Sequence, residues 1–397
     1  MFFLGSGDKH ECCGCRACEQ ICPTACISVY VDDEGFLYPL KDSVRCINCD
    51  LCRGVCPCAN GEFLLAAGSS CYSRAYMAKH KDKSIVYNSA SGGVFSALVS
   101  SFCDGEFAVF GVELNDSFEV VHSFTQTISG TLKYRKSKYV QSDIKRSYKK
   151  AEEFLKNGCK VLFTGTPCQV AGLRLFLGKD YENLLTADLV CHGVPSQKVF
   201  DRYLSFLQQK YGGIVTSYGF RHKSLKWRRW NSRNIRVVVG KKEIIRDSMT
   251  DEYLRGFHKS LYYRPSCYEC KFANPNRISD FTMADFWGVE KKYPSEIVHR
   301  GVSALLANTE KALALVDTLK SHLSMLEVER DFVIQNNRQL QRATVRHPRR
   351  AEFFRELDTV DFSDLVDRCV PKPPVIRRVA SRVLSDRAKN AIRQIWS

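Results

Sequence analysis

Residues 12–23 read CCGCRACEQICP, and residues 46–57 read CINCDLCRGVCP. Each stretch contains the pattern CxxCxxCxxxCP, so two runs of four cysteines lie within the first 57 residues. Two intervening residues allow successive thiolates to converge on one face of an iron–sulfur cubane, and the proline turns the chain after the fourth ligand. The repeat therefore predicts two iron–sulfur clusters that carry single electrons.

The two runs have the spacing of bacterial two-cluster ferredoxins, in which the fourth cysteine of each run ligates the cluster of the other run. This crossed pairing predicts one folding unit, an α+β two-cluster ferredoxin domain over residues 1–60, with a small hairpin between the runs at 27–31 and 35–39. The first 4Fe–4S cluster would take Cys12, Cys15, Cys18 and Cys56. The second would take Cys46, Cys49, Cys52 and Cys22. Three more cysteines fall outside the pattern and are predicted to be spare thiols: Cys13, Cys26 and Cys58.

Structural zinc and a disulfide framework are the alternatives for the two runs. Zinc ribbons use two separated pairs of cysteines rather than four in a tight run, and disulfides need an oxidising compartment. The chain has 19 cysteines, and its start reaches glycine and charge too soon for the apolar region of a secretory signal. We therefore expect a reducing cytoplasmic location. No stretch approaches the roughly 18 apolar residues of a membrane helix.

The composition predicts a soluble protein of two or three domains, because 397 residues with 44% hydrophobic and 26% charged residues can build a full core. The net charge of +16 suits nucleic acid, an anionic membrane, an acidic protein or a phosphorylated ligand. Residues 220–230 interleave basic side chains with tryptophans, which fits single-stranded nucleic acid, a phosphorylated cofactor or an acidic electron donor. No nucleic-acid motif accompanies this patch, so nucleic acid is the least favoured partner.

Strands and helices alternate from about residue 72. We expect strands at 107–112, 160–164 and 185–190, helices at 144–156, 169–177 and 196–211, and shorter β segments over 214–247. Such alternation favours a parallel α/β core, so residues 70–330 are predicted to form an α/β central domain after a linker of small residues at 59–70.

Residues 340–397 form a basic C-terminal tail, and 375–396 are predicted to be a basic amphipathic helix. Docking on the protein itself or on a partner subunit is favoured over peripheral contact with an anionic membrane, because cationic faces are common on soluble helices.

Four cysteines of the central domain lie in turns. Cys168 lies at a strand-to-helix turn, Cys191 ends the next strand, and Cys267 and Cys270 form a CxxC pair. Turns that follow parallel strands gather at one edge of a sheet, where ligands bind. Spacing alone leaves open a third cluster, a zinc site or a redox dithiol. A turn residue is the favoured interpretation of the neighbouring His192.

A second signal is the turn Ser91, Gly92 and Gly93, which opens an apolar helix. Free backbone N–H groups and the positive end of a helix suit a phosphate, and a simple helix cap is the alternative. The nearby Lys138 and Tyr139 could add a cation and an aromatic face.

The ordered set SGG, SKYVQS, TGTPCQVAGLR, DLVCHGVPS, FRHKS, CYEC and ISDFTMADFWG resembles the deazaflavin-dependent (coenzyme factor-420) hydrogenase/dehydrogenase beta-subunit family over about residues 70–310. The N-terminal runs resemble those of longer members with two extra clusters. The resemblance implies FAD and one further 4Fe–4S cluster, the latter held by Cys168, Cys191, Cys267 and Cys270. It also places a set of residues near the FAD diphosphate, the flavin and the same pocket: Ser91, Gly92, Gly93, Lys138, Tyr139, Asp285 and Trp287.

The function that follows from this resemblance is an iron–sulfur flavoprotein oxidoreductase that passes electrons between 4Fe–4S clusters, FAD and an organic two-electron partner. A deazaflavin (coenzyme factor-420) oxidoreductase and a non-catalytic electron-transfer subunit of a larger complex remain the alternatives. The expected protein partner is an acidic electron carrier or another oxidoreductase subunit.

Overall fold

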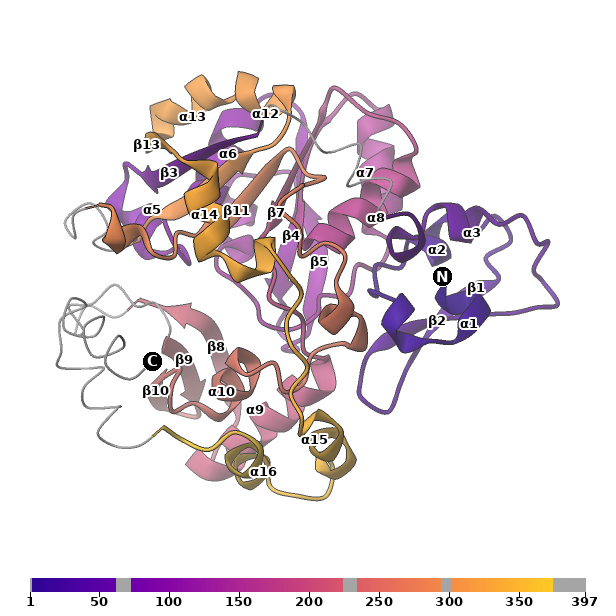
Figure 1. Cartoon of the computed structure of the whole chain (residues 1–397), viewed down its shortest axis with the longest axis vertical. Helices are drawn as coiled ribbons and strands as arrows, with labels where there is room; N and C mark the ends of the chain where they lie inside the picture. Colours follow the sequence, from indigo (N-terminus) through magenta and orange to yellow (C-terminus); the bar gives the residue numbers. More distant parts are fainter. Residues whose placement is uncertain (1, 62–72, 224–233, 294–300, 374–397) are drawn as a thin grey trace.

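The computed structural model describes residues 2–61, 73–223, 234–293 and 301–373. Figure 1 shows a large sheet covered by helices at the top, a smaller lobe below it, and the cysteine-rich N-terminal unit at the right. None of the helices in the described part of the chain has the length and apolar character needed to span a bilayer.

The N-terminal unit repeats its backbone as well as its cysteines. Arg16 and Asp50, each directly after the second cysteine of its run, adopt the left-handed conformation, with φ of 57° and 55°, and each begins a short helix. The predicted hairpin is confirmed, with Ile27 opposite Lys41 and Val31 opposite Leu37. The elements are α1 (Phe3–Ser6), η1 (Lys9–Glu11), α2 (Ala17–Ile21), β1 (Ile27–Val31), β2 (Leu37–Lys41) and α3 (Leu51–Gly54).

The large sheet has eight strands in the order β13-β3-β12-β11-β7-β6-β4-β5. Its strands are β3 (Arg74–His80), β4 (Phe107–Leu114), β5 (Val120–Thr125), β6 (Lys160–Gly165), β7 (Leu184–Leu189), β11 (Phe281–Asp285), β12 (Ser303–Ala307) and β13 (Leu323–Val328). The four central strands, β11, β7, β6 and β4, run parallel to one another, and the outer pairings are antiparallel. The predicted parallel core is thus correct for the centre only, and the sheet as a whole is mixed.

Helices cover both faces of this sheet, which explains why β6 and β7 are buried along almost their whole length. In β6, Val161 and Phe163 pack toward α7 and α8, whereas Leu162 packs toward α6 and α13. The helices around the sheet are α5 (Lys83–Tyr87), α6 (Val94–Phe102), α7 (Ser147–Lys156), α8 (Pro167–Leu177), α12 (Glu310–Ala314), α13 (Val316–His322) and α14 (Arg330–Asn336). Short turns are η2 (Ser129–Tyr134), η3 (Pro265–Glu269), η4 (Val289–Lys291) and η5 (Arg338–Leu340).

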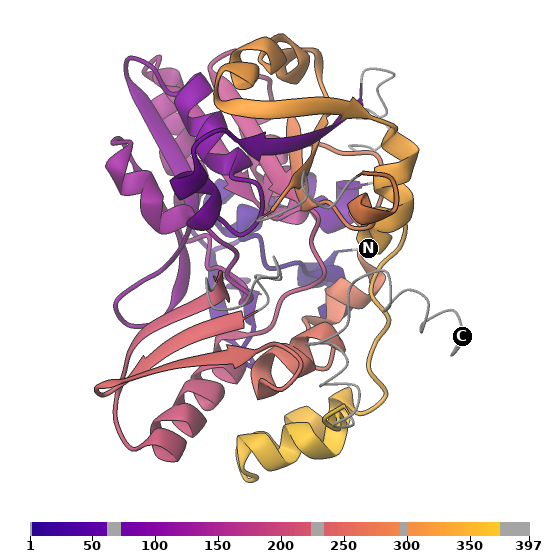
Figure 2. The same cartoon turned by 90° about the vertical axis from the view of Figure 1, so that its left-hand side faces the viewer.

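The smaller lobe is built on the predicted long helix and the predicted short strands. Its elements are α9 (Gln197–Tyr211), β8 (Val215–His222), β9 (Asn234–Val239), β10 (Lys242–Asp247), α10 (Glu252–His258), α15 (Arg350–Glu356) and α16 (Phe362–Cys369). Figure 2 shows α15 and α16, in yellow, at the foot of the molecule with this lobe. Phe353 and Phe362 lie in the same buried apolar cluster as Phe200, Tyr203 and Val237, so this part of the predicted tail completes the core of the lobe.

The N-terminal unit shares a core with the large sheet. Cys15, Ala17 and Val55 belong to the buried apolar cluster of α7 and α8. Gly172 of α8 faces Cys15, and a Cβ at position 172 would lie 3.2 Å from the Cys15 Sγ and 2.8 Å from the Tyr148 hydroxyl. Gly172, the second glycine in TGTPCQVAGLR, therefore permits close approach of the cysteine-rich unit to α8.

Candidate functional site

A cavity of about 570 Å³ opens at the edge of the large sheet where β6, β7 and β11 end. This volume lies within the range of about 300 to 1,000 Å³ typical of small-molecule and cofactor sites. The chain leaves β6 through Cys168, β7 through Cys191, and β11 at Asp285, and all three residues line the cavity. The sheet edge thus brings the predicted turn residues together as parallel strands require. We call this space the central cavity.

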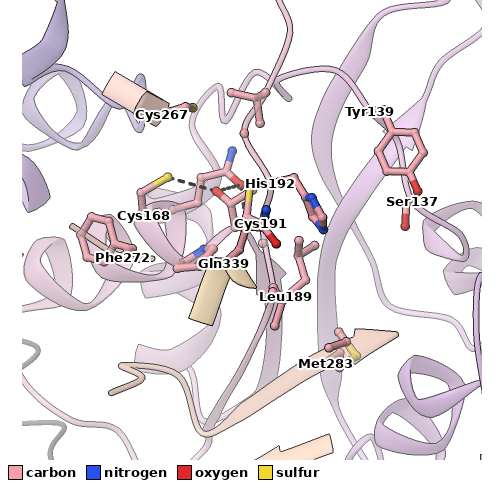
Figure 3. A pocket seen from close by; sticks show the side chains of 18 of the residues that line it. Ser137, Tyr139, Cys168, Leu189, Cys191, His192, Cys267, Phe272, Met283 and Gln339 are labelled. Carbon is pink, nitrogen blue, oxygen red and sulfur yellow. Dashed lines mark hydrogen bonds between the residues drawn. The ribbon is translucent and has the colours of Figure 1, made fainter. Parts of the chain in front are cut away.

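The four predicted cysteines of the central domain all line this cavity. Cys168 lies in the first turn of α8, which Thr166 and Gln169 close with a capping box. Cys267 lies in η3 and Cys270 directly follows it. Figure 3 shows Cys168, Cys191 and Cys267 on one side of the cavity and Ser137 and Tyr139 on the other, with His192 between them.

Burial and mutual proximity disfavour ionisation of three of these thiols, whereas the neighbouring Cys13 thiol lowers the pKa of Cys168. Burial raises the pKa of Cys191 to about 12, and the charge of Cys168 adds to the shift. Burial likewise raises the pKa of Cys270 to about 12, with Cys168 again contributing. Burial raises the pKa of Cys267 well above its usual range, and the charges of Cys191 and Cys270 add to the shift. Four thiolates here would need a compensating cationic centre, which an iron–sulfur cluster or a metal ion supplies.

The N-terminal runs line two further cavities. Each cavity is lined by the first three cysteines of one run and by the fourth cysteine of the other run. The inner cavity is lined by Cys12, Cys15, Cys18 and Cys56. The outer cavity is lined by Cys22, Cys46, Cys49 and Cys52. Within the described ranges, no three Cys, His, Asp or Glu residues form a group that could hold a metal ion. The sulfurs are instead distributed around the walls of the three cavities.

Two of the three cysteines predicted to be spare thiols lie where the cavities meet. Cys13 lines both the inner and the central cavity, and Cys58 lines the central cavity. The neighbouring thiols of Cys15, Cys168 and Cys58, followed by burial, raise the pKa of Cys13. The third, Cys26, lies in the wall of the outer cavity, 3.4 Å from the Cys22 Sγ. Spacing could not reveal these positions, because none of the three cysteines belongs to a repeated pattern.

The glycine pair of the SGG turn is required mainly by the sheet beneath it. The Gly92 N–H donates to the Ser303 Oγ at 2.9 Å, and a Cβ at position 92 would lie 2.4 Å from the Ala78 carbonyl oxygen. Ser91 and Gly93 line the central cavity, and Gly93, with φ +90°, precedes the first residue of α6. The turn therefore presents the start of α6 to the cavity while Gly92 packs against β3 and β12.

Arg221 joins three of the sequence motifs, and the sequence indicated it only as part of the basic patch and of the FRHKS motif. Its guanidinium donates to both carboxylate oxygens of Asp285, at 2.9 and 3.2 Å, to the Tyr139 hydroxyl at 3.2 Å and to the Ala90 carbonyl at 2.9 Å. The contact fixes Tyr139 and Asp285 against the SGG turn. Trp287, which follows Asp285 by two residues, also lines the cavity.

Lys138 lines the cavity, but its ammonium group bonds to its own loop. It donates to the carbonyls of Lys133 and Arg135 at 2.7 and 2.9 Å, and burial lowers its pKa to about 7. The same loop carries Arg135 and Lys136 to the cavity wall. Lys138 thus holds a loop whose neighbouring cations reach the cavity.

Of the remaining predicted features, His192 lies at the central cavity, and three segments lie outside the described residues. His192 lines the cavity, and burial lowers its pKa, which favours the neutral imidazole. The basic and tryptophan-containing stretch at 224–230, most of the 59–70 linker and the 375–396 helix lie outside the described residues.

Part of the chain matches the model of a known protein family. Residues 141–330 match the family model that describes the C-terminal part of the beta subunit of coenzyme F420 hydrogenase/dehydrogenase. Among solved structures, the chain is similar to a chain of the F420-reducing nickel–iron hydrogenase complex from Methanosarcina barkeri, with 16% identity and a TM-score of 0.44, covering 69% of this chain and 96% of that one. No curated protein sequence matches. The matched segment contains all four central cysteines, and the match agrees with the resemblance of the sequence motifs to the coenzyme F420 hydrogenase/dehydrogenase beta-subunit family.

Proposed function

We propose that this protein is a cytoplasmic iron–sulfur flavoprotein oxidoreductase. It passes electrons between three 4Fe–4S clusters, FAD and an organic two-electron partner. The observation that carries the proposal is the continuity of three thiol-lined cavities. Cys13 lines both the inner and the central cavity, and Phe2 lines both the inner and the outer cavity.

The donor sets of the three cavities fit iron–sulfur clusters. Each contains four cysteines from the predicted patterns, and thiolate sulfur is the ligand of 4Fe–4S centres. Distribution of four sulfurs around a cavity suits a cubane, whose irons are separate centres, better than one zinc ion with Zn–S of about 2.3 Å. We assign the inner cavity to the first cluster, the outer cavity to the second and the central cysteines to the third.

The rest of the central cavity fits a flavin dinucleotide. The start of α6 at Gly93 supplies backbone N–H groups, Arg135 and Lys136 supply cations, and Tyr139 supplies an aromatic face. Bound clusters would carry electrons one at a time, and a bound flavin would transfer them in pairs. This redox chemistry belongs to the cofactors themselves. The chain contributes position: Arg221 fixes Tyr139 and Asp285, and Lys138 fixes the loop that carries the two cations.

The outer cavity is the expected point of contact with a protein partner. Cys49 is exposed there, and Ile47, which lines the same cavity, is 63% exposed. The net charge of +16 favours an acidic electron carrier or an acidic subunit of a larger oxidoreductase.

Anaerobic purification followed by joint analysis of iron, acid-labile sulfide and flavin tests this function. Three clusters predict about twelve iron atoms per chain, together with one FAD. Iron at this level without flavin and without turnover would instead identify a non-catalytic electron-transfer subunit. Flavin-dependent reduction of a deazaflavin, with no activity toward other organic acceptors, would identify a deazaflavin oxidoreductase. Absence of iron from protein purified and reconstituted anaerobically would refute the proposal.

A further inference from the structure

Arg264 is a buried cation at the junction of the inner and central cavities. Its side chain is fully buried, with 0% exposure. It stands directly before η3, three residues from Cys267 of the central cavity, and it reaches back to Cys12 of the inner cavity. A guanidinium group does not lose its proton in proteins, so a full positive charge is held at this junction.

Three of the four hydrogen bonds of this guanidinium are directed at the N-terminal unit. Nε donates to the Cys12 carbonyl at 2.6 Å, and Nη2 donates to the Leu37 carbonyl at 2.9 Å and to the Cys12 Sγ at 3.3 Å. Nη1 donates to the Gln141 Oε1 at 3.0 Å. In the described part of the chain, none of its hydrogen bonds goes to a carboxylate, and its one bond to a side chain of the N-terminal unit goes to the Cys12 sulfur.

The surrounding backbone is shaped to admit this side chain. A Cβ at Gly14 would lie 2.8 Å from the Arg264 Nη1 and 2.5 Å from the Gln141 Nε2, and Gly14 has φ +72°. The Tyr38 ring lies beneath the guanidinium, with its centroid 4.2 Å from Cζ. The guanidinium is therefore held in one orientation by contacts on several sides.

We propose that Arg264 is a positioning residue that raises the reduction potential of the cluster in the inner cavity through its charge and its N–H···S hydrogen bond to Cys12. Hydrogen bonds to ligand sulfurs and local net charge are the main means by which proteins set cluster potentials. Reduction adds one negative charge to the cluster, and a fixed cation beside a ligand stabilises the reduced form more than the oxidised form. This inference rests on the proposed function, because it requires a cluster in the inner cavity.

Arg350 provides a matched control. It is a second buried arginine that ties the N-terminal unit to the rest of the chain, donating to the Glu34 carboxylate and to the Tyr263 carbonyl next to Arg264. None of its hydrogen bonds in the described structure reaches a sulfur. Arg350→Gln therefore removes a buried guanidinium that contacts the N-terminal unit but does not line the inner cavity.

The test is an anaerobic redox titration followed by electron paramagnetic resonance on the full chain, with the inner cluster identified by the signal that Cys18→Ser removes. Arg264→Gln is expected to shift the reduction equilibrium of this cluster at least tenfold toward the oxidised form, about 59 mV for a one-electron couple. Arg264→Lys, which keeps the charge, should shift it less, and Arg350→Gln should leave it unchanged. An unshifted potential in Arg264→Gln with full iron content, or an equal shift in Arg350→Gln, would overturn the inference.

A second measurement covers the case in which Arg264→Gln does not assemble. Wild-type protein isotopically labelled at the arginine guanidinium nitrogens should show a nitrogen coupling to the reduced inner cluster in pulsed paramagnetic resonance, and Arg264→Lys should lack it. A wild-type spectrum without this coupling would refute the contact. Absence of iron from wild-type protein would instead refute the proposed function, so the two failures are distinguishable.

Discussion

The N-terminal unit and the central cavity each bring four predicted cysteines to a site, but they assemble them in opposite ways. In the N-terminal unit the eight pattern cysteines come from two short runs, and a left-handed residue after the second cysteine recurs in both. In the central cavity the four cysteines follow β6, follow β7 and lie in or beside η3, far apart in sequence. The first site is a property of local backbone, and the second is a property of sheet topology.

Glycines in the two regions make room for different groups, side chains in one case and backbone in the other. Gly14 and Gly172 admit neighbouring side chains at the junction between the unit and the sheet. Gly92 instead admits the backbone of β3 and β12. A motif glycine can therefore serve assembly of the site without touching a ligand.

The largest expected effect is loss of whole clusters. Cys267→Ser with Cys270→Ser should remove about four of about twelve iron atoms and leave the N-terminal clusters in place. Cys22→Ser should remove the same cluster signal as Cys46→Ser, although the two cysteines belong to different runs, because both line the outer cavity. Iron analysis with paramagnetic resonance checks both. If Cys22→Ser instead abolishes the signal that Cys18→Ser abolishes, the crossed pairing is wrong.

Loss of Arg221 should be the largest effect on stability that is independent of iron. Arg221→Met leaves the Asp285 carboxylate without its bidentate partner, and removal of one member of a buried pair costs about 3 to 5 kcal/mol. The double variant Arg221→Met with Asp285→Met should lose less, because no uncompensated carboxylate remains. Denaturant unfolding under anaerobic conditions measures the free energies of unfolding. Equal or greater loss in the double variant would contradict the contact.

A smaller effect is expected at the SGG turn. Gly92→Ala places a Cβ 2.4 Å from a backbone oxygen that cannot turn away, and overpacking of this kind typically costs about 1 to 3 kcal/mol. Gly54→Ala is the control, because no atom lies within 4 Å of its added Cβ. The same unfolding measurement applies. Unchanged stability of Gly92→Ala would show that the turn is not anchored on the sheet.

The smallest effect concerns pH. The Lys223 Nζ donates to the carbonyls of Val86 and Ser91, and burial, followed by the charge of Arg221, lowers its pKa to about 7. An unfolded lysine titrates near about 10.4, so between about pH 7 and about pH 10 the unfolded chain holds a proton that the folded protein has released. The free energy of unfolding should therefore rise with pH across this window.

Lys223→Met should flatten that rise when unfolding is measured at several pH values. Other charges act on Lys223, namely Asp285, which raises its pKa, and Lys136 and Lys79, which lower it. Lys138→Met provides a comparison, because burial lowers the pKa of Lys138 to a similar value. A slope identical to that of wild type in Lys223→Met would show that Lys223 stays charged in the folded protein.

Much of the fold was accessible from the sequence because its signals are local. The hairpin at β1 and β2, the strands β4, β6, β7, β9 and β10 and the helix α9 all lie where hydrophobic patterning predicts them. The strands β3, β5, β11, β12 and β13 were not predicted, and the mixed character of the sheet was missed with them, since strand direction depends on long-range pairing rather than on local pattern. The packing of α15 and α16 into the smaller lobe was missed for the same reason.

The sequence by itself determined the cysteine spacing, the alternation of strands and helices and the residue types available for ligation, because each depends on neighbours along the chain. Only the tertiary structure decided that Cys13 stands between two cavities, that Arg221 joins three motifs and that Arg264 reaches the Cys12 sulfur. These contacts join residues distant in sequence. They exist because the carboxyl ends of parallel strands meet at one edge, and because the N-terminal unit packs against the helix that begins there.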